Sequence, residues 1–318
     1  MTVTVRPISA PAHLEVIAAR GAASFLQTPA WGAVKRDWRP QLLGFFRDRQ
    51  TTPFGAGLVL YRQVPRLRRY LAYLPEGPVL DWDAMDPTAI GESLTALVAH
   101  VKAQHAFGLR IGPPVVTRRW SAATVKDGIS AGAATHLPDL PADETTPVGH
   151  RVAAALARAG FRPPQDNGGF SAGQPRYVFQ VPLAGRSDDE LLAGFNQLWR
   201  RNIRKAAKAG VVVRQGCADD LGAFHRLYAE TAARDGFTPR PLGYFQGMWE
   251  AMHAEDPDRL RLYLAHHDGD LVAATTMVQV GTHAWYSYGA SSTAKREVRG
   301  SNAVQWQMMR DARDAGAT

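Results

Sequence analysis

The segment RDGFTPRPLGYF contains an arginine and a tyrosine whose types and spacing suit the binding of an anion. Arg240 and Tyr244 are four residues apart, so they share one face of any helix that begins near Pro239–Pro241. A guanidinium fork beside a phenol matches the geometry of a phosphate or a carboxylate. Alternatively, Arg240 caps its own loop and Tyr244 lies half in the core, and these residues alone favour neither interpretation.

A second group of candidate binding residues lies in the basic run WRRNIRKAAKAGVVVR. On a helix, most of its cations recur at three- and four-residue spacing and share one face. No acidic residue lies among them, so a polyanion that neutralised them would gain affinity, with a dependence on salt. A solvated helix face is the commoner origin of a charge run, but the lack of interspersed acids favours an RNA or phosphate contact. The candidate residues are Arg200, Arg201, Arg204, Lys205 and Lys208.

The C-terminal stretch from His283 to Ala317 reads as a strand, a basic loop and a helix. We expect Asn302 to cap this helix, whose first unpaired N–H groups would favour an anion. The same order forms the acyl-CoA site of GNAT-type acyltransferases. The residues that follow Arg299, GSNAV, lack the further glycines that a close approach to pyrophosphate would need. The stretch therefore predicts acyl transfer from a donor other than CoA.

Composition and motifs exclude several other classes of site. One cysteine, Cys217, allows no internal disulfide and no Cys-based zinc site, and the ten histidines form no HxxxH or HxH pair. We therefore expect no metal and no cofactor, and no acid/base pair can be recognised, so the catalytic residues stay unassigned. A net charge of +8 favours phosphate-bearing partners or an anionic membrane surface. No signal peptide or membrane span is apparent, which predicts a cytoplasmic protein.

The elements that must position these residues follow the same order twice. Residues 35–115 and 228–317 each read as helical segments, an antiparallel hairpin, a tyrosine-bearing strand and a helix. Asp86-Pro87 starts the helix of the first copy, residues 117–147 read as a surface loop with one short helix, and residues 188–209 read as helical. Two α+β domains of one architecture, 1–174 and 175–318, would explain the repeat; the alternative is chance similarity.

Several stretches together resemble the FemABX family of peptidoglycan bridge-forming aminoacyltransferases. The matching stretches are SFLQTPAWGAVK, YLPEGPVLDW, RRNIRKAAKAGVVV, RDGFTPRPLGYF, RLYLAHHDGDLVAA and the segment from His283 to Ala317. The resemblance implies tandem GNAT-like acyltransferase domains, with the first domain on the precursor-binding side. The coiled-coil arm of some members has no room in residues 188–210. The implied activity moves an amino acid from aminoacyl-tRNA to the stem-peptide amine of a peptidoglycan precursor.

The resemblance also assigns roles to single residues. Lys35 stands where the family's precursor-phosphate lysine is expected, Arg240 and Tyr244 match its R-x-x-x-Y pair, and Tyr288 matches the aromatic of its Y-x-G-S strand. Gly112 replaces a frequent aspartate, so no carboxylate role carries over. Relatives continue beyond the position of Thr318 with a strand and an F-K-x-G-F-like tail, whose oxyanion lysine is not in this sequence.

The implied partners are aminoacyl-tRNA and a peptidoglycan precursor, either lipid II or UDP-MurNAc-pentapeptide. Lys35 and Arg240 would clamp the precursor diphosphate, Tyr244 and Tyr288 would line the channel, and the basic run would meet the tRNA. We also expect a monomer with peripheral contact to the inner membrane leaflet. The open alternatives are an acyl-CoA-dependent GNAT N-acyltransferase and a non-catalytic basic module that binds RNA or the envelope.

Overall fold

The computed structural model describes residues 2–132, 134–164 and 174–318. By its internal contacts the chain forms two compact units. Unit 1 contains Met1–Val16 and Asp37–Arg176, and unit 2 contains Ile17–Arg36 and Tyr177–Thr318. The main break lies two residues beyond the predicted boundary at 174/175. Residues 17–36, which the sequence assigned to the first domain, make their contacts in unit 2.

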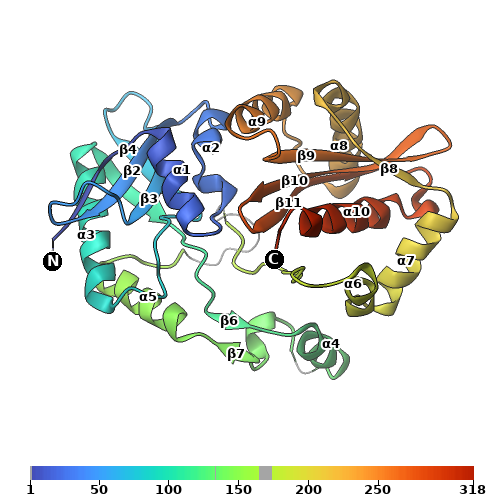
Figure 1. The fold of residues 1–318 in the computed structure, drawn as a ribbon, viewed down its shortest axis with the longest axis horizontal. Helices are drawn as coiled ribbons and strands as arrows, with labels where there is room; N and C mark the ends of the chain where they lie inside the picture. Colours follow the sequence, from blue (N-terminus) through green and yellow to red (C-terminus); the bar gives the residue numbers. More distant parts are fainter. Residues whose placement is uncertain (1, 133, 165–173) are drawn as a thin grey trace. The chain divides into compact units, whose positions relative to one another are not determined.

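Unit 1 is built on a five-stranded sheet in the order β1-β2-β3-β4-β5 (Figure 1). Its first three pairings are antiparallel, whereas β4 and β5 are parallel. A parallel pair needs a crossover connection, and helix α3 supplies it. The strands are β1 Val3–Pro7, β2 Arg39–Arg47, β3 Gly55–Gln63, β4 Tyr70–Leu74 and β5 Ala106–Ile111. The helices α1 and α3 cover Ala10–Ala19 and Pro87–Ala103, and the division between the units passes through α1.

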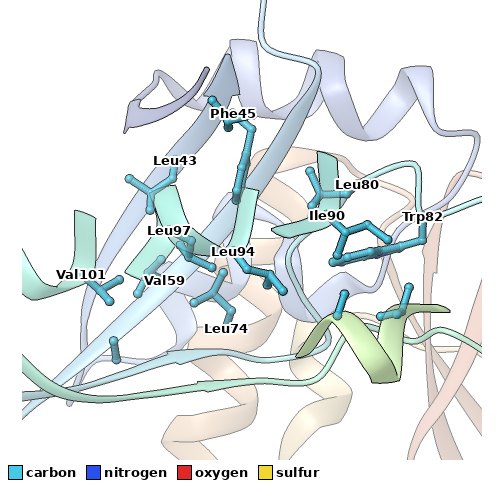
Figure 2. Close-up of a cluster of buried hydrophobic side chains, with 14 of the residues drawn as sticks. Leu43, Phe45, Val59, Leu74, Leu80, Trp82, Ile90, Leu94, Leu97 and Val101 are labelled. Atoms are coloured by element: carbon cyan, nitrogen blue, oxygen red, sulfur yellow. The ribbon is translucent and has the colours of Figure 1, made fainter. Parts of the chain in front are cut away.

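Helix α3 closes the core of unit 1 with one apolar stripe. Asp86 caps its first turn by accepting the Ala89 N–H at 2.8 Å, and Pro87 occupies the first helical position. The buried side chains recur at the helical period and pack on the sheet, as Figure 2 shows. They are Ile90, Leu94, Leu97 and Val101 from the helix and Leu43, Phe45, Val59 and Leu74 from the strands. The predicted start of this helix at Asp86-Pro87 is confirmed.

The rest of unit 1 is more ordered than the sequence suggested. The predicted short helix within residues 117–147 is α4, and two two-residue strands form a small antiparallel ladder that the sequence did not indicate. Helix α5 follows and packs Val152 and Ala155 on the core of unit 1. The elements are β6 Arg118–Arg119, α4 Ala122–Ser130, β7 Glu144–Thr145 and α5 Pro147–Arg158.

Unit 2 is a four-stranded antiparallel sheet, β11-β10-β9-β8, with helices on both faces (Figure 1). Successive residues of β9 point to opposite faces: Tyr263 packs with helix α10, and Leu262 packs with helices α8 and α9. The strands are β8 Val212–Gln215, β9 Leu260–His267, β10 Asp270–Val280 and β11 His283–Ser291. The helices are α2 Pro29–Val34, α6 Asp188–Gly194, α7 Gln197–Lys208, α8 Leu221–Asp235, α9 Leu242–Glu255 and α10 Gly300–Asp314.

The two units repeat one chain order. In unit 1 a strand and a helical segment precede an antiparallel hairpin, a further strand and a covering helix: β1, α1, β2, β3, β4 and α3. Unit 2 follows the same plan with β8, α8 and α9, β9, β10, β11 and α10. The repeat predicted from the sequence is therefore confirmed.

The helical stretch predicted for residues 188–209 is two helices rather than one. Helix α6 ends before Phe195, and the Asn196 side chain accepts the Trp199 N–H at 2.9 Å and so begins α7. With seven and twelve residues, neither could form a long coiled-coil arm, and no such arm occurs in the described parts of the chain. No helix in those parts combines the length and the apolar character needed to span a bilayer.

Candidate functional site

Lys35 is held by a short helix whose contacts lie in unit 2. The Thr28 side chain accepts the Trp31 N–H at 3.3 Å, and Pro29 fills the first turn of α2. Trp31 is buried, while Lys35 caps the C-terminal end of the helix and is half-buried. The Lys35 Nζ lies 4.4 Å from the centroid of the Trp31 ring, within cation–π distance. Helix α2 ends at Val34, one residue before Lys35.

A buried carboxylate fixes the other end of α2. Glu255, the last residue of α9, accepts the Ala30 N–H at 2.8 Å, where the helix N-terminus favours negative charge. Its second oxygen lies 3.2 Å from Arg259 Nε, and both side chains are at most 10% exposed. Arg259 in turn donates to the Gln279 carbonyl at 3.1 Å. Burial raises the pKa of Glu255, although the Ala30 N–H and the Arg259 charge oppose that effect.

Two tyrosines from different elements meet at the start of α9. The hydroxyls of Tyr244 on α9 and Tyr288 on β11 lie 3.0 Å apart, and the ring centroids are 6.1 Å apart. Burial and the neighbouring Tyr288 raise the pKa of Tyr244 far above its ordinary value. The Tyr244 phenol therefore keeps its proton at neutral pH and acts as a hydrogen-bond donor or acceptor, not as a base.

A bulge in β11 sets the position of Tyr288. The pairing with β10 passes from Thr276–Tyr288 to Met277–Tyr286, which leaves Ser287 unpaired. The Tyr288 N–H donates to the Thr276 hydroxyl at 3.1 Å, and its carbonyl accepts from the Thr275 hydroxyl at 3.0 Å. Below the ring, Phe245 and Tyr228 make edge contacts at centroid distances of 5.1 and 6.1 Å. Tyr288 thus sits on a rigid aromatic base.

Arg240 approaches the same tyrosine as Lys35. Its side chain is exposed, and its Cζ lies 5.3 Å from the centroid of the Tyr244 ring, while the Lys35 Nζ lies 5.4 Å from that centroid. His225 Nε2 lies 3.0 Å from the Arg240 carbonyl oxygen and steadies the loop before α9. Helix α9 begins at Leu242, so the predicted start near Pro239–Pro241 is confirmed. The structure brings all four predicted substrate-binding residues together.

This cluster can bind an anion through two cations and two phenol hydroxyls. Cations with complementary donors suit a diphosphate, because each charged hydrogen bond is stronger than a neutral one. Among the described residues around this cluster, no carboxylate is paired with an imidazole for acid–base catalysis. In the described part of the chain, no three histidine, cysteine, aspartate or glutamate residues are grouped to hold a metal ion.

Trp31 and Tyr228 contact this cluster, and Glu255 anchors α2 at the end away from it; none of the three was predicted as a site residue. Trp31 lies four residues before Lys35, and that helical spacing was a usable signal. Tyr228 is a buried aromatic residue of α8, and burial alone does not distinguish a site residue from a core residue. Glu255 gave no sequence signal, since its partner Ala30 is 225 residues away.

The basic run forms one face of α7. Ile203 and Ala206 are buried, whereas four cations are exposed and form no ion pair with any described residue: Arg201, Arg204, Lys205 and Lys208. Arg200 differs from these four, because it is half-buried and donates to the Ala193 carbonyl at 3.0 Å. Arg200 therefore ties α7 to the end of α6, and the other four carry the cationic face.

A pocket of about 260 Å³ opens between β11 and the start of α10. Its lining is mixed and includes Arg234, Tyr286, Ser291, Ser301 and Gln305. The basic loop 292–299 contributes no residue to the lining, and its Lys295 forms an ion pair with Asp270 at 2.7 Å. The lining comes from β11 and α10, the strand and helix that the sequence singled out for acyl transfer, and also from α8 and β10.

The start of α10 corrects the predicted cap. The residue that precedes the helix is Arg299, in the left-handed region at φ 62°, so Asn302 already lies inside the first turn. Gly300 is needed for packing: a Cβ there would lie 2.7 Å from Val272 Cγ2. The glycine therefore seats α10 on the sheet.

Comparison with known proteins shows the family and the fold of the chain. A model described as the FemAB family matches residues 15–270. The Lipid II:glycine glycyltransferase of Staphylococcus aureus is 23% identical over 365 residues, covering 92% of this chain and 78% of the relative, and so is the protein of strain MRSA252. A crystal structure of FemX superposes with a TM-score of 0.71 at 21% identity, covering 99% of this chain and 87% of that one.

The fold is α+β, with two GNAT-like domains in tandem and no long coiled-coil arm in the described residues. The predicted fold class is therefore confirmed. The family model spans most of the chain, and the chain belongs to the FemAB family, as the resemblance implied.

Proposed function

We propose that this protein transfers an amino acid from aminoacyl-tRNA to the stem-peptide amine of a peptidoglycan precursor, which builds the cross-bridge. The observation that carries the proposal is the meeting of Lys35 and Arg240 at the Tyr244 ring, both within 5.4 Å of its centroid. Two cations beside one aromatic ring suit the diphosphate of a lipid-linked or nucleotide-linked precursor. Family membership and the glycyltransferase relative favour this acceptor.

The chemistry is the aminolysis of an ester. The acceptor nitrogen attacks the ester carbonyl, and the carbonyl oxygen gains charge in the tetrahedral intermediate. The C–O bond to the tRNA ribose then breaks, and the proton lost by the amine ends on the departing ribose oxygen as a hydroxyl. Because an aminoacyl ester is already reactive, positioning can supply much of the rate. Tyr244 and Tyr288 would line the channel and offer hydrogen bonds through their hydroxyls, and we assign no general base.

The donor side would use two further features of unit 2. The pocket between β11 and α10 has room and polar groups for a small aminoacyl end. The cationic face of α7, with Arg200 as its tie to α6, would meet the tRNA acceptor arm through the phosphate backbone.

The test offers radiolabelled aminoacyl-tRNA, one amino acid at a time, with purified lipid-linked and soluble precursors. We expect transfer to one precursor class from a restricted set of tRNAs, and Arg240→Ala should raise the precursor KM about tenfold, the loss of one charged hydrogen bond. Tight CoA binding in calorimetry together with acetyl transfer would instead indicate a CoA-dependent N-acyltransferase. Precursor binding without turnover on any charged tRNA would indicate a non-catalytic module.

A further inference from the structure

The loop that joins β3 to β4 in unit 1 is a tight, arginine-rich turn (Figure 1). We call this loop together with the last two residues of β3, residues 62–69, the arginine turn. The Val64 N–H donates to the Arg69 carbonyl at 2.8 Å and the Leu67 N–H donates to the Val64 carbonyl at 3.1 Å. The Gln63 side chain also donates to the Leu67 carbonyl at 3.0 Å. Three hydrogen bonds inside eight residues give the turn a defined shape.

The charge of this turn is unbalanced. All of its arginines are exposed, and none forms an ion pair with a described residue: Arg62, Arg66, Arg68 and Arg69. No acidic residue occurs between Asp48 and Glu76 in the sequence. An exposed cluster of one sign within so short a segment repels itself, so an anionic surface that faces the cluster gains affinity.

The tip of the turn is apolar. Leu67 is 55% exposed and stands between two arginines, where a solvated loop would ordinarily carry a polar residue. An RNA contact would gain little from an aliphatic side chain, because bases stack on aromatic or guanidinium planes. A bilayer accommodates both groups: arginines bind the lipid phosphates, and an aliphatic tip enters the boundary between headgroups and acyl chains.

We propose that the arginine turn docks the protein on a bilayer that contains anionic phospholipid, with Leu67 inserted and the arginines at the headgroup phosphates. The inference does not depend on the proposed transfer reaction, because vesicles without precursor or tRNA suffice to test it. It assigns the expected peripheral membrane contact to one named surface.

The first experiment is co-sedimentation of the full chain with vesicles of phosphatidylcholine alone or with added phosphatidylglycerol. We expect binding only to the anionic vesicles, weakened by salt. Each arginine near such a surface contributes roughly fivefold to partitioning, so Arg68→Gln/Arg69→Gln should bind about 25-fold more weakly. Arg158→Gln/Arg162→Gln is the matched control, since it removes the same charge from exposed positions of unit 1. An equal loss in the control, or no binding by the native protein, overturns the proposal.

The second experiment reports insertion directly. An environment-sensitive fluorophore is attached at Leu67→Cys in a Cys217→Ser background, because Cys217 is the only cysteine of the chain. We expect a blue shift in emission with anionic vesicles and none when the label is at Ile129→Cys, a position 69% exposed on α4. No shift at position 67 overturns insertion. If Arg68→Gln/Arg69→Gln weakens tRNA binding but not vesicle binding, the turn is an RNA contact and the proposal fails.

Discussion

Lys35 and Arg240, the two cations beside the Tyr244 ring, can be removed separately and together, which gives the sharpest test of the proposed precursor clamp. A hydrogen bond to a charged group contributes about 1.5–3 kcal/mol, and each 1.4 kcal/mol is about tenfold in an equilibrium constant. Arg240 is exposed, so solvent screening places Arg240→Ala near the lower end, about tenfold. Lys35 is half-buried against Trp31, so Lys35→Ala should approach the upper end, about 100-fold.

The double variant distinguishes one clamp from two independent contacts. If both cations hold one diphosphate, the loss of either loosens the ligand from the other, and the two effects are not multiplicative. We expect Arg240→Ala to cost at least about twofold less in the Lys35→Ala background than in the native protein, a coupling of about 0.5 kcal/mol. The assay is calorimetric binding of UDP-MurNAc-pentapeptide, with melting temperatures to confirm that every variant is folded.

Two controls make this result decisive. Arg36→Ala removes the neighbouring cation, whose ion pair with Glu250 is 3.9 Å long and 74% exposed on both sides, so binding should not change. The free stem peptide lacks the diphosphate, so neither Lys35→Ala nor Arg240→Ala should weaken its binding. Equal losses for the free peptide, or effects of the two substitutions that multiply, would refute the clamp.

Three further predictions follow from unit 2. Tyr244→Phe should lower kcat about tenfold with little change in precursor KM, because it removes one of the two tyrosine hydroxyls that lie 3.0 Å apart but keeps the ring beside both cations. An unchanged kcat in both Tyr244→Phe and Tyr288→Phe would exclude these hydroxyls from the reaction. The raised pKa of Glu255 means that the folded state binds a proton more tightly than the unfolded chain, so native stability falls as pH rises from the ordinary carboxyl pKa through the raised one. Melting temperatures from pH 4 to 8 should show this fall in the native protein and not in Glu255→Gln. Parallel curves for the two proteins would contradict the prediction. Arg204→Gln/Lys205→Gln should raise the KM for aminoacyl-tRNA while the precursor KM stays constant. The slope of the logarithm of the tRNA binding constant against the logarithm of the salt concentration should become shallower by about 1.4–1.8. An unchanged slope would show that α7 does not contact the tRNA.

Local signals were enough to predict most of the elements. Asp86 and Pro87 define the start of α3 because a cap and a first-turn proline act within four residues. The strands were predictable from alternation and turn residues, and β4 is a tyrosine-bearing strand, as the sequence indicated. The repeated order of elements then predicted two units of one architecture, since each copy contains its own hairpin, strand and helix.

Contacts between distant residues could not be predicted in this way. The assignment of residues 17–36 to unit 2 depends on the Ala30–Glu255 hydrogen bond and on packing with α9, neither of which leaves a local pattern. The start of α10 was misplaced because Arg299 adopts a left-handed conformation, and an arginine gives no sign of that. The break between α6 and α7 was missed because Asn196 was not recognised as a cap.

The position of Lys35 beside Tyr244 follows from the way α2 lies along α9. The Ala30 N–H meets Glu255 at the end of α9, whereas Lys35 at the other end of α2 reaches Tyr244 near the start of α9, so the two helices run antiparallel. At 1.5 Å per residue, Tyr244 and Glu255 are about 16 Å apart along the axis, which α2 and an extended lysine side chain can span. The position of the Lys35 ammonium therefore depends on the Glu255 contact at the other end of α2. For this reason a substitution at Glu255 should change the precursor KM, although this carboxylate contacts no part of the proposed ligand.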